Sequence, residues 1–140
     1  MAGTNTLAII KPKAVENGNV GAILHTINAA GFQIKGLKML RLTRKQAEEF
    51  FAAHKKSEIF QSLVEFMTSG PIVVAAIYGE NAVEQFRSLM GANDPKQAGP
   101  ETIRGKFGTN ATMNAIHGSE SDEIAKKEIE FMFKPEELFF

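Results

Sequence analysis

The sequence predicts an α+β fold, in which helices pack on one four-stranded antiparallel sheet. Short apolar runs of strand length are separated by segments in which apolar residues recur at helical spacing. The chain has 140 residues, which is the size of one compact domain. Because no repeat, low-complexity tract or linker interrupts it, we expect residues 1–140 to form a single domain.

The first half of the chain alternates between strand and helix. The expected elements are a strand at 6–10, a helix from residue 20 to a stop at residue 31, a strand at 32–42, and helices at 44–53 and 59–67. Pro12 ends the first strand because proline lacks a backbone donor, and Gly31 ends the first helix. Thr43 and Gln46 have the spacing of a capping box, which predicts where the next helix begins.

The second half contains a central strand and a long connection. The expected elements are a turn at 69–71, a strand at 72–78, a helix at 82–90, a loop at 91–112, a helix from 119 to about 129 that opens with a second capping box, and a short strand at 130–133. Loops of this length inside a small domain are usually functional or disordered. This order of elements fits the ferredoxin-like βαββαβ arrangement.

Composition excludes several classes of protein. Sixteen basic and sixteen acidic side chains give no net charge, which argues against duplex nucleic acid as the main partner. The absence of cysteine excludes disulfides, thiol catalysis and thiolate zinc sites, and suits a reducing compartment. No apolar run approaches the roughly 18 residues of a membrane span, and the first residues do not resemble a signal peptide. We therefore expect a cytoplasmic protein without membrane segments.

One histidine and three cations are the candidates for chemistry. His25 and His54 have the surroundings of surface residues, whereas His117 stands in a turn just before a capped helix. A turn histidine with satisfied nitrogens explains His117 equally well. Lys11 ends the first strand, and Arg87 and Arg104 flank or lie in the long loop, where they suit phosphate oxygens. Each cation taken alone is more typical of a solvated surface.

The standard phosphate loop is absent. Gly99 and Gly105 are one residue too far apart for it, and Phe107 stands where serine or threonine would be needed. The free N–H groups of the helix expected near Ser119 offer another place for an anion.

The segment around His117 resembles a known signature. Residues 114–121 read Asn-Ala-Ile-His-Gly-Ser-Glu-Ser and are similar to the N-x-x-H-G-S-D-S signature of nucleoside diphosphate kinases. The resemblance extends along nearly the whole chain. It includes Ile9-Ile10-Lys11-Pro12, Ser69-Gly70-Pro71, the segment 100–107 and Glu128-Ile129.

This resemblance implies the ferredoxin-like fold and a two-step phosphate exchange. The family's histidine takes the terminal phosphate of a nucleoside triphosphate, commonly ATP, and passes it to a nucleoside diphosphate, which maintains triphosphate pools. Magnesium bridges the nucleotide phosphates, and no protein side chain is expected to bind it. A homotetramer or homohexamer is also implied. Since an ordinary imidazole has a pKa of about 6.5, it is mostly neutral at pH 7 and can attack phosphorus without a separate base.

The resemblance also assigns residues to roles. His117 is the nucleophile through the ring nitrogen nearer the backbone, Glu128 fixes its tautomer, and Ser119 supports Glu128. The nucleotide-binding residues are Lys11, which also belongs to the catalytic group, Ile59, Arg87, Asn93, Arg104 and Asn114. Among these the three cations contact phosphates, and Lys11 and Asn114 reach the ribose.

Several positions depart from the family pattern. Asn93 replaces a threonine on the phosphates, and Phe51 replaces a tyrosine near the histidine. The base clamp, usually phenylalanine opposite valine, is Ile59 opposite Ala111, so base stacking is weaker unless Phe60 takes its place. Further departures are Lys106, Met113 and Glu120. These changes affect affinity and rate more than the class of reaction.

Two other functions remain open from the sequence. A binding or regulatory module would bind nucleotide without exchange. A single-stranded nucleic acid binder would need exposed aromatics and a basic face, but the chain has no tryptophan and one tyrosine. Dedicated nucleic-acid binding is therefore not expected. The apolar C-terminus, Leu138-Phe139-Phe140, suits either a contact with a neighbouring subunit or packing on its own domain.

Overall fold

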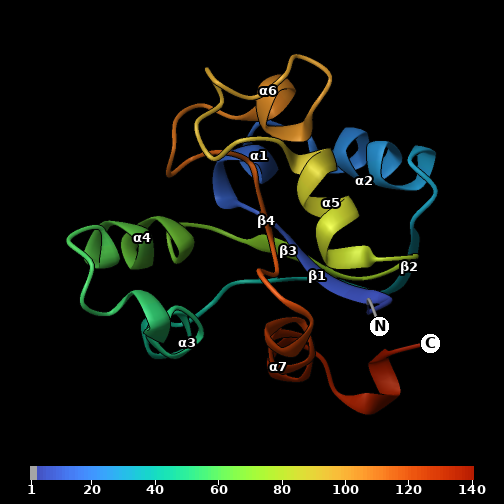
Figure 1. Ribbon diagram of the computed structural model, residues 1–140. Helices are drawn as coiled ribbons and strands as arrows, with labels where there is room; N and C mark the ends of the chain where they lie inside the picture. Colours follow the sequence, from blue (N-terminus) through green and yellow to red (C-terminus); the bar gives the residue numbers. More distant parts are fainter. Residues whose placement is uncertain (1–2) are drawn as a thin grey trace.

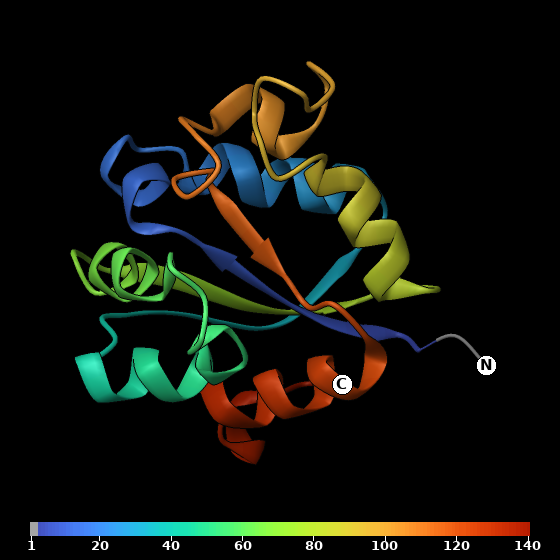
Figure 2. The ribbon, with the colours of Figure 1, turned by 60° about the vertical axis from the view of Figure 1, so that its left-hand side comes forward.

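The structure is a computed structural model that describes residues 3–140, in which helices cover both faces of one sheet (Figures 1 and 2). Within these residues the strands are β1 (Asn5–Ile10), β2 (Gln33–Leu40), β3 (Ile72–Tyr78) and β4 (Ile116–Gly118). They form a four-stranded sheet in the order β2-β3-β1-β4, with every neighbouring pair antiparallel. This order and direction confirm the expected ferredoxin-like α+β fold.

The helices divide between the two faces of the sheet. The α-helices are α1 (Pro12–Glu16), α2 (Val20–Ala29), α3 (Arg44–Phe50), α4 (Phe60–Met67), α5 (Ala82–Met90), α6 (Ile103–Phe107) and α7 (Asp122–Met132), and the short 3₁₀ helices are η1 (Ala52–His54) and η2 (Pro135–Glu137). Helices α3, α4 and α7 pack on one face, and α1, α2, α5 and α6 pack on the other. Both layers are visible in Figure 2.

Strand β1 joins the two cores because its side chains alternate between faces. Leu7 and Ile9 belong to the core under α3, α4 and α7, whereas Ala8 and Ile10 belong to the core under α2 and α5. All four side chains are almost completely buried. Because β1 is an inner strand buried on both faces and ends at Ile10, Lys11 lies at the end of an inner strand of the sheet.

Most of the expected elements are present with small shifts at their ends. The strands at 72–78 and 5–10 and the helices beginning at residues 20, 44, 60 and 82 agree with the sequence patterns. The capping box of Thr43 and Gln46 is formed in both directions. The helix expected to run to residue 53 ends at Phe50 and continues as η1 after Phe51.

The expected final strand at 130–133 is wrong. Helix α7 continues to Met132, because Ala125, Ile129 and Met132 are buried at helical spacing against the sheet. The fourth strand is instead β4, which pairs with β1 through three residues. The second capping box is also absent. Ser121 caps α7 by accepting from the Ile124 N–H, and isoleucine has no acceptor with which to return the bond.

Two short helices were not expected. Helix α6 lies inside the segment predicted as a loop, and Thr102 caps it by accepting from the Gly105 N–H. Helix α1 follows Pro12, which occupies the first helical turn, where its missing N–H costs nothing. In the part of the chain that the structure describes, no helix is long and apolar enough to cross a membrane.

Candidate active site

His117 lies in the middle of β4, opposite Ile9 of β1. Its Nε2 atom lies 3.1 and 3.2 Å from the two carboxylate oxygens of Glu128 on α7. Because an ionised carboxylate only accepts hydrogen bonds, this contact places the ring proton on Nε2. The Nδ1 atom, which is nearer the backbone, then carries the lone pair. The structure therefore brings His117 and Glu128 together as the sequence predicted.

Ser119 fixes the position of Glu128. Its hydroxyl donates to Oε1 of Glu128 at 2.6 Å and accepts from the Leu7 N–H at 3.1 Å. The serine is fully buried. Since both partners hold the hydroxyl, the carboxylate cannot rotate freely, and the imidazole that it contacts is held in turn.

An aromatic wall of Phe50, Phe51 and Phe131 borders the imidazole. The rings of Phe50 and Phe51 meet it edge-on, with centroid distances of 5.6 and 6.1 Å, and Phe131 packs edge-on against Phe50 at 5.5 Å. These rings and His117 line a cavity of about 270 Å³. Sequence reasoning missed Phe50 and Phe131, although apolar residues on two helices that flank a candidate histidine would have pointed to them.

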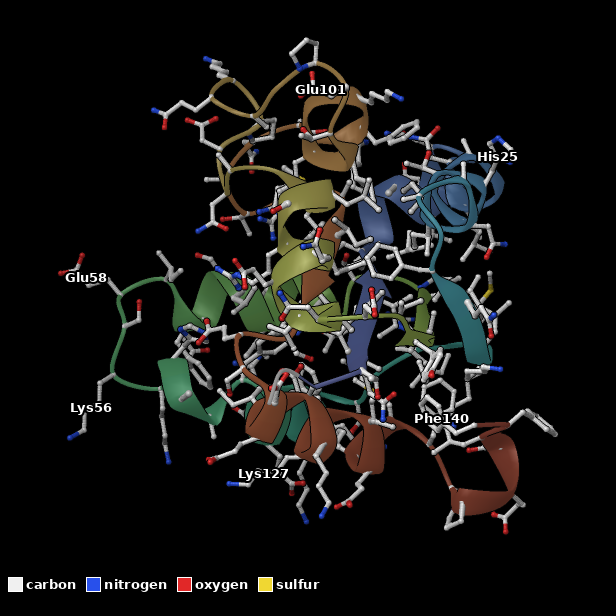
Figure 3. All side chains as sticks on the ribbon, turned by 45° about the vertical axis from the view of Figure 1, so that its right-hand side comes forward. His25, Lys56, Glu58, Glu101, Lys127 and Phe140 are labelled. Atoms are coloured by element: carbon white, nitrogen blue, oxygen red, sulfur yellow. The ribbon has the colours of Figure 1, made fainter. Side chains whose placement is uncertain are left out.

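The other two histidines differ from His117 in their surroundings. His25 is exposed on α2 and projects away from the body of the molecule (Figure 3). His54 is also exposed, but it lies on the rim of the cavity beside His117.

The backbone before β4 is strained. Ala115 has φ of 80°, a left-handed conformation that costs a non-glycine residue free energy, and its side chain is buried. Its carbonyl accepts from the Lys11 N–H at 2.8 Å. This turn connects Asn114 to the strand that holds the histidine, so the strain lies within the signature segment.

Lys11 is buried where β1 meets α1. Its Nζ donates to Oδ1 of Asn114 at 2.7 Å and to the carbonyl of Thr112 at 3.3 Å. Burial, and secondarily the charge of Arg104, lower the pKa of Lys11 from 10.5 to about 7. A neighbouring anion would reverse this shift, because it stabilises the charged ammonium.

Arg104 on α6 is the second buried cation. Its Nη1 donates to the carbonyl of Gly91 and to Oδ1 of Asn93, both at 3.0 Å, and its Nη2 donates to the carbonyl of Ile116 at 3.0 Å. Burial and then the charge of Arg87 lower its pKa from 12.5 to about 10, so it remains charged at neutral pH.

The three predicted cations therefore converge, even though the chain has no net charge. After burial, the charge of Arg104 lowers the pKa of Lys11, and the charge of Arg87, which is exposed on α5, lowers the pKa of Arg104. The bond from Arg104 to Ile116 joins this group to the residue before His117. Lys106 is exposed on α6.

Asn114 connects Lys11 to the long loop. Its amide oxygen accepts from Lys11, and its amide nitrogen donates to the carbonyls of Asn93 and Ala111, both at 3.0 Å. Asn114 is almost completely buried. These contacts fix Asn114 within the protein and place Asn93 between it and Arg104.

The region of the expected base clamp lies between α4 and the end of the long loop. Ala111 lines a cavity of about 530 Å³ with Ser62 and Phe66 of α4. Ile59, at the residue that precedes α4, is 55% exposed. The suggestion that Phe60 replaces the missing aromatic face is wrong, because Phe60 is buried in the core under α3, α4 and α7.

Among the residues described, no group of three or more histidine, cysteine, aspartate or glutamate side chains is arranged to hold a metal ion. The cations instead suit anionic oxygens. An imidazole with an unprotonated Nδ1 next to buried cations, on a ferredoxin-like sheet, has the features of a phosphoryl-transfer enzyme.

Comparisons with known proteins show to which family of phosphoryl-transfer enzymes the chain belongs. The family model described as nucleoside diphosphate kinase matches residues 4–138. A nucleoside diphosphate kinase of Campylobacter jejuni subsp. doylei is 50% identical over 134 residues, which cover 96% of this chain and 98% of that protein. One from Campylobacter hominis is 49% identical over 133 residues, covering 95% and 97%.

Solved structures agree with these sequence relatives. The nucleoside diphosphate kinase of Aquifex aeolicus superposes with a TM-score of 0.95 at 46% identity, covering 96% of this chain and 98% of that one. A halophilic nucleoside diphosphate kinase from Halobacterium salinarum, in complex with CDP, superposes with a TM-score of 0.94 at 35% identity, covering 100% and 93%. The chain belongs to the nucleoside diphosphate kinase family. It is an enzyme that transfers phosphate between nucleoside triphosphates and diphosphates.

Proposed function

We propose that this enzyme works by a ping-pong mechanism in which His117 carries the phosphate. The observation that supports this most directly is the contact of both Glu128 oxygens with Nε2. That contact stabilises the tautomer whose lone pair is on Nδ1, which is the form able to attack phosphorus.

The two half-reactions balance without a separate base. Nδ1 of His117 attacks the terminal phosphorus of a triphosphate such as ATP, a P–N bond forms, and the P–O bond to the diphosphate breaks. A terminal oxygen of a second diphosphate then attacks the same phosphorus, and the P–N bond breaks. The Nε2 proton stays in its hydrogen bond to Glu128 throughout, since the hydrogen bond becomes stronger as the ring gains positive charge.

The cations would bind and orient the phosphates. Lys11, Arg87 and Arg104 would stabilise the charge on the transferred group and on the diphosphate, as the largest contribution to such reactions is electrostatic. The other nucleotide-binding residues would be Asn93, which acts near the phosphates through the Arg104 guanidinium that it contacts, Asn114 beside the ribose, and Ile59 beside the base. The low pKa of Lys11 in the free enzyme supports this role, because an anion restores its charge.

Kinases of nucleotides generally need a divalent metal, and here we propose Mg²⁺. Because the described residues offer no cluster of metal ligands, the ion would bind through the nucleotide phosphate oxygens. There it neutralises phosphate charge, while the protein supplies the lysine and arginines.

Assembly, domain structure and location are further parts of the proposal. We expect one domain over 1–140, since both cores share a single sheet. A homotetramer or homohexamer is supported by Phe139 and Phe140, which are 73% and 55% exposed at the C-terminus. Phe140 lines a cavity with residues of β1 and α7 and so lies against its own domain (Figure 3). A cytoplasmic location suits an enzyme of nucleotide pools and a sequence without cysteine.

The test is transfer through an isolated phosphoenzyme. Incubation with ATP labelled at the terminal phosphate should give an acid-labile, base-stable phosphoprotein that passes its label to GDP and to other diphosphates. His117→Asn should not become labelled. Binding of nucleotide without a labelled protein would instead favour a regulatory module, and a labelled His117→Asn variant would show that another residue is the nucleophile.

A further inference from the structure

We propose that Asn93 is a positioning residue, which holds the guanidinium of Arg104 for the phosphate and ties it to Asn114. This inference rests on the proposed function, because it explains how the phosphate pocket is kept in shape. The contacts that carry it are a hydrogen bond from Arg104 Nη1 to the Asn93 side chain and one from the Asn114 side chain to the Asn93 carbonyl, both 3.0 Å long.

The guanidinium of Arg104 has few donors to spare. Two donors on Nη1 bind Gly91 and Asn93, and one donor on Nη2 binds Ile116. The Nε atom is buried without a hydrogen-bond partner among the residues described. A phosphate would therefore bind Arg104 through the remaining Nη2 donor. The orientation of the guanidinium depends on the oxygens of Gly91, Asn93 and Ile116 that accept its other hydrogen bonds.

The acceptors that hold the Arg104 guanidinium are neutral oxygens of Gly91, Asn93 and Ile116. Burial, and secondarily the charge of Arg104, lower the pKa of Lys11, so the two cations lie near enough for their charges to repel. Neutral carbonyl and amide oxygens can hold two such cations without cancelling the positive charge that a phosphate needs. A carboxylate at the same place would neutralise it.

Asn93 also connects the two cations through hydrogen bonds. Its backbone carbonyl accepts from Asn114, and the Asn114 amide oxygen accepts from Lys11. A chain of contacts thus runs from Arg104 through Asn93 and Asn114 to Lys11. Because the side-chain oxygen of Asn93 is committed to Arg104, its effect on the reaction goes through that arginine.

The first test is a double-mutant cycle on formation of the phosphoenzyme. Asn93→Leu, which keeps the size but removes the acceptor, should lower kcat/KM about tenfold, as expected for a lost hydrogen bond to a charged group. In an Arg104→Met background the same change should cost less than about twofold, because the two residues act as one unit. Equal losses in both backgrounds would overturn the proposal and make Asn93 a direct phosphate donor. Asn28→Leu, on the exposed part of α2, is the matched control for the substitution.

The second test measures the mobility of Arg104 itself, so it uses no variant at residue 104. Nitrogen-15 NMR of the arginine side chains measures how fast the Nη1 and Nη2 groups of Arg104 exchange by rotation. Restricted rotation in the original protein should be released in Asn93→Leu and retained in Asn93→Asp, which keeps an acceptor oxygen. Unchanged rotation in Asn93→Leu would overturn the proposal. Failure to form any phosphoenzyme would instead refute the proposed function, while leaving this NMR result interpretable.

Discussion

The carboxylate of Glu128 lies within hydrogen-bond distance of His117 Nε2 through both of its oxygens, at 3.1 and 3.2 Å. The two residues come from different elements, β4 and α7, which pack on the same strand β1. The pairing determines which ring nitrogen keeps the proton, and hence which one can attack. The tautomer of His117, the proposed nucleophile, is thus determined by the way in which a helix docks on the sheet.

Glu128→Gln should slow phosphorylation of His117 by about 10- to 100-fold, because an orienting partner of a histidine has effects of that size. The amide can donate as well as accept, so it also stabilises the tautomer with its proton on Nδ1. Rapid-mixing measurements of phosphoenzyme formation test this. The exposed neighbour substitution Glu130→Gln on the same helix is the control. A rate equal to that of the original protein would show that the contact is not used.

Ser119→Ala should destabilise the fold as well as the site. Removing the hydroxyl leaves the buried Leu7 N–H without its acceptor, which should lower the free energy of unfolding by about 1–3 kcal/mol. Denaturant titration measures this loss. Ser121→Ala, which removes only the cap of α7, should cost about 1 kcal/mol and leave phosphorylation intact. Equal phosphorylation rates in Ser119→Ala and Ser121→Ala would show that Ser119 does not hold Glu128.

Binding of a triphosphate should be coupled to proton uptake by Lys11. In the free enzyme burial lowers the pKa of this lysine to about 7, so above pH 7 it is mostly neutral, and an anion raises the pKa and draws a proton on. Uptake should therefore be largest near pH 8 and vanish toward pH 6, where the lysine is already charged. Calorimetry in buffers of different ionisation enthalpy measures the number of protons.

Comparison with Lys11→Met distinguishes the proton taken up by Lys11 from the protons taken up or released by the nucleotide. The difference in proton uptake between the two proteins should be positive at pH 8 and close to zero at pH 6. A difference that is absent at pH 8, or that grows as the pH falls, would contradict the role given to Lys11.

Ile59→Phe should strengthen nucleotide binding. An aromatic ring at this exposed position can stack on a base, which should lower KM for a nucleoside diphosphate about fivefold or more. The phosphate contacts are unchanged, so kcat should change little. In the matched variant Phe60→Leu, stability should fall and KM should stay the same, since Phe60 is in the core. A KM that responds to Phe60 and not to Ile59 would show that the base binds elsewhere.

The sequence predicted the bounds of an element well where the apolar pattern extends over many residues. The strand at 72–78 and the helix at 82–90 agree with the structure at both ends, because each has seven or more residues with a clear apolar pattern. The three residues of β4 are too short for any such pattern. Their strand character comes from pairing with β1, which is a contact between residues about a hundred positions apart.

The end of α7 and the starts of α1 and α6 each have a local signal in the sequence. Met132 continues the buried stripe of Ala125 and Ile129, so the end of α7 was readable as helix. Pro12 at a first helical turn and Thr102 as a cap are ordinary signs of helix starts.

The candidate site was predictable as a set of residues, but its geometry was not. The resemblance around His117 pointed to Glu128, and the structure places the two side chains in contact. Lys11 and Arg104 are linked through Asn114 and Asn93, whereas their contact with phosphate stays a prediction. The bond from Arg104 to Asn93 could not have been predicted, since it depends on how the long loop folds back on α6. The burial of Phe60, in contrast, follows from the sequence, because Phe60, Leu63, Val64 and Met67 recur at helical spacing and are buried together.

The most direct test of the mechanism is to locate the phosphorus on the histidine ring. Phosphorus and nitrogen NMR of the phosphoenzyme, with labelled imidazole nitrogens, distinguishes the two ring atoms. Phosphate on Nδ1 of His117, with the proton still on Nε2, is the expected result. Phosphate on Nε2, or on any residue other than His117, would contradict the role given to the Glu128 contact.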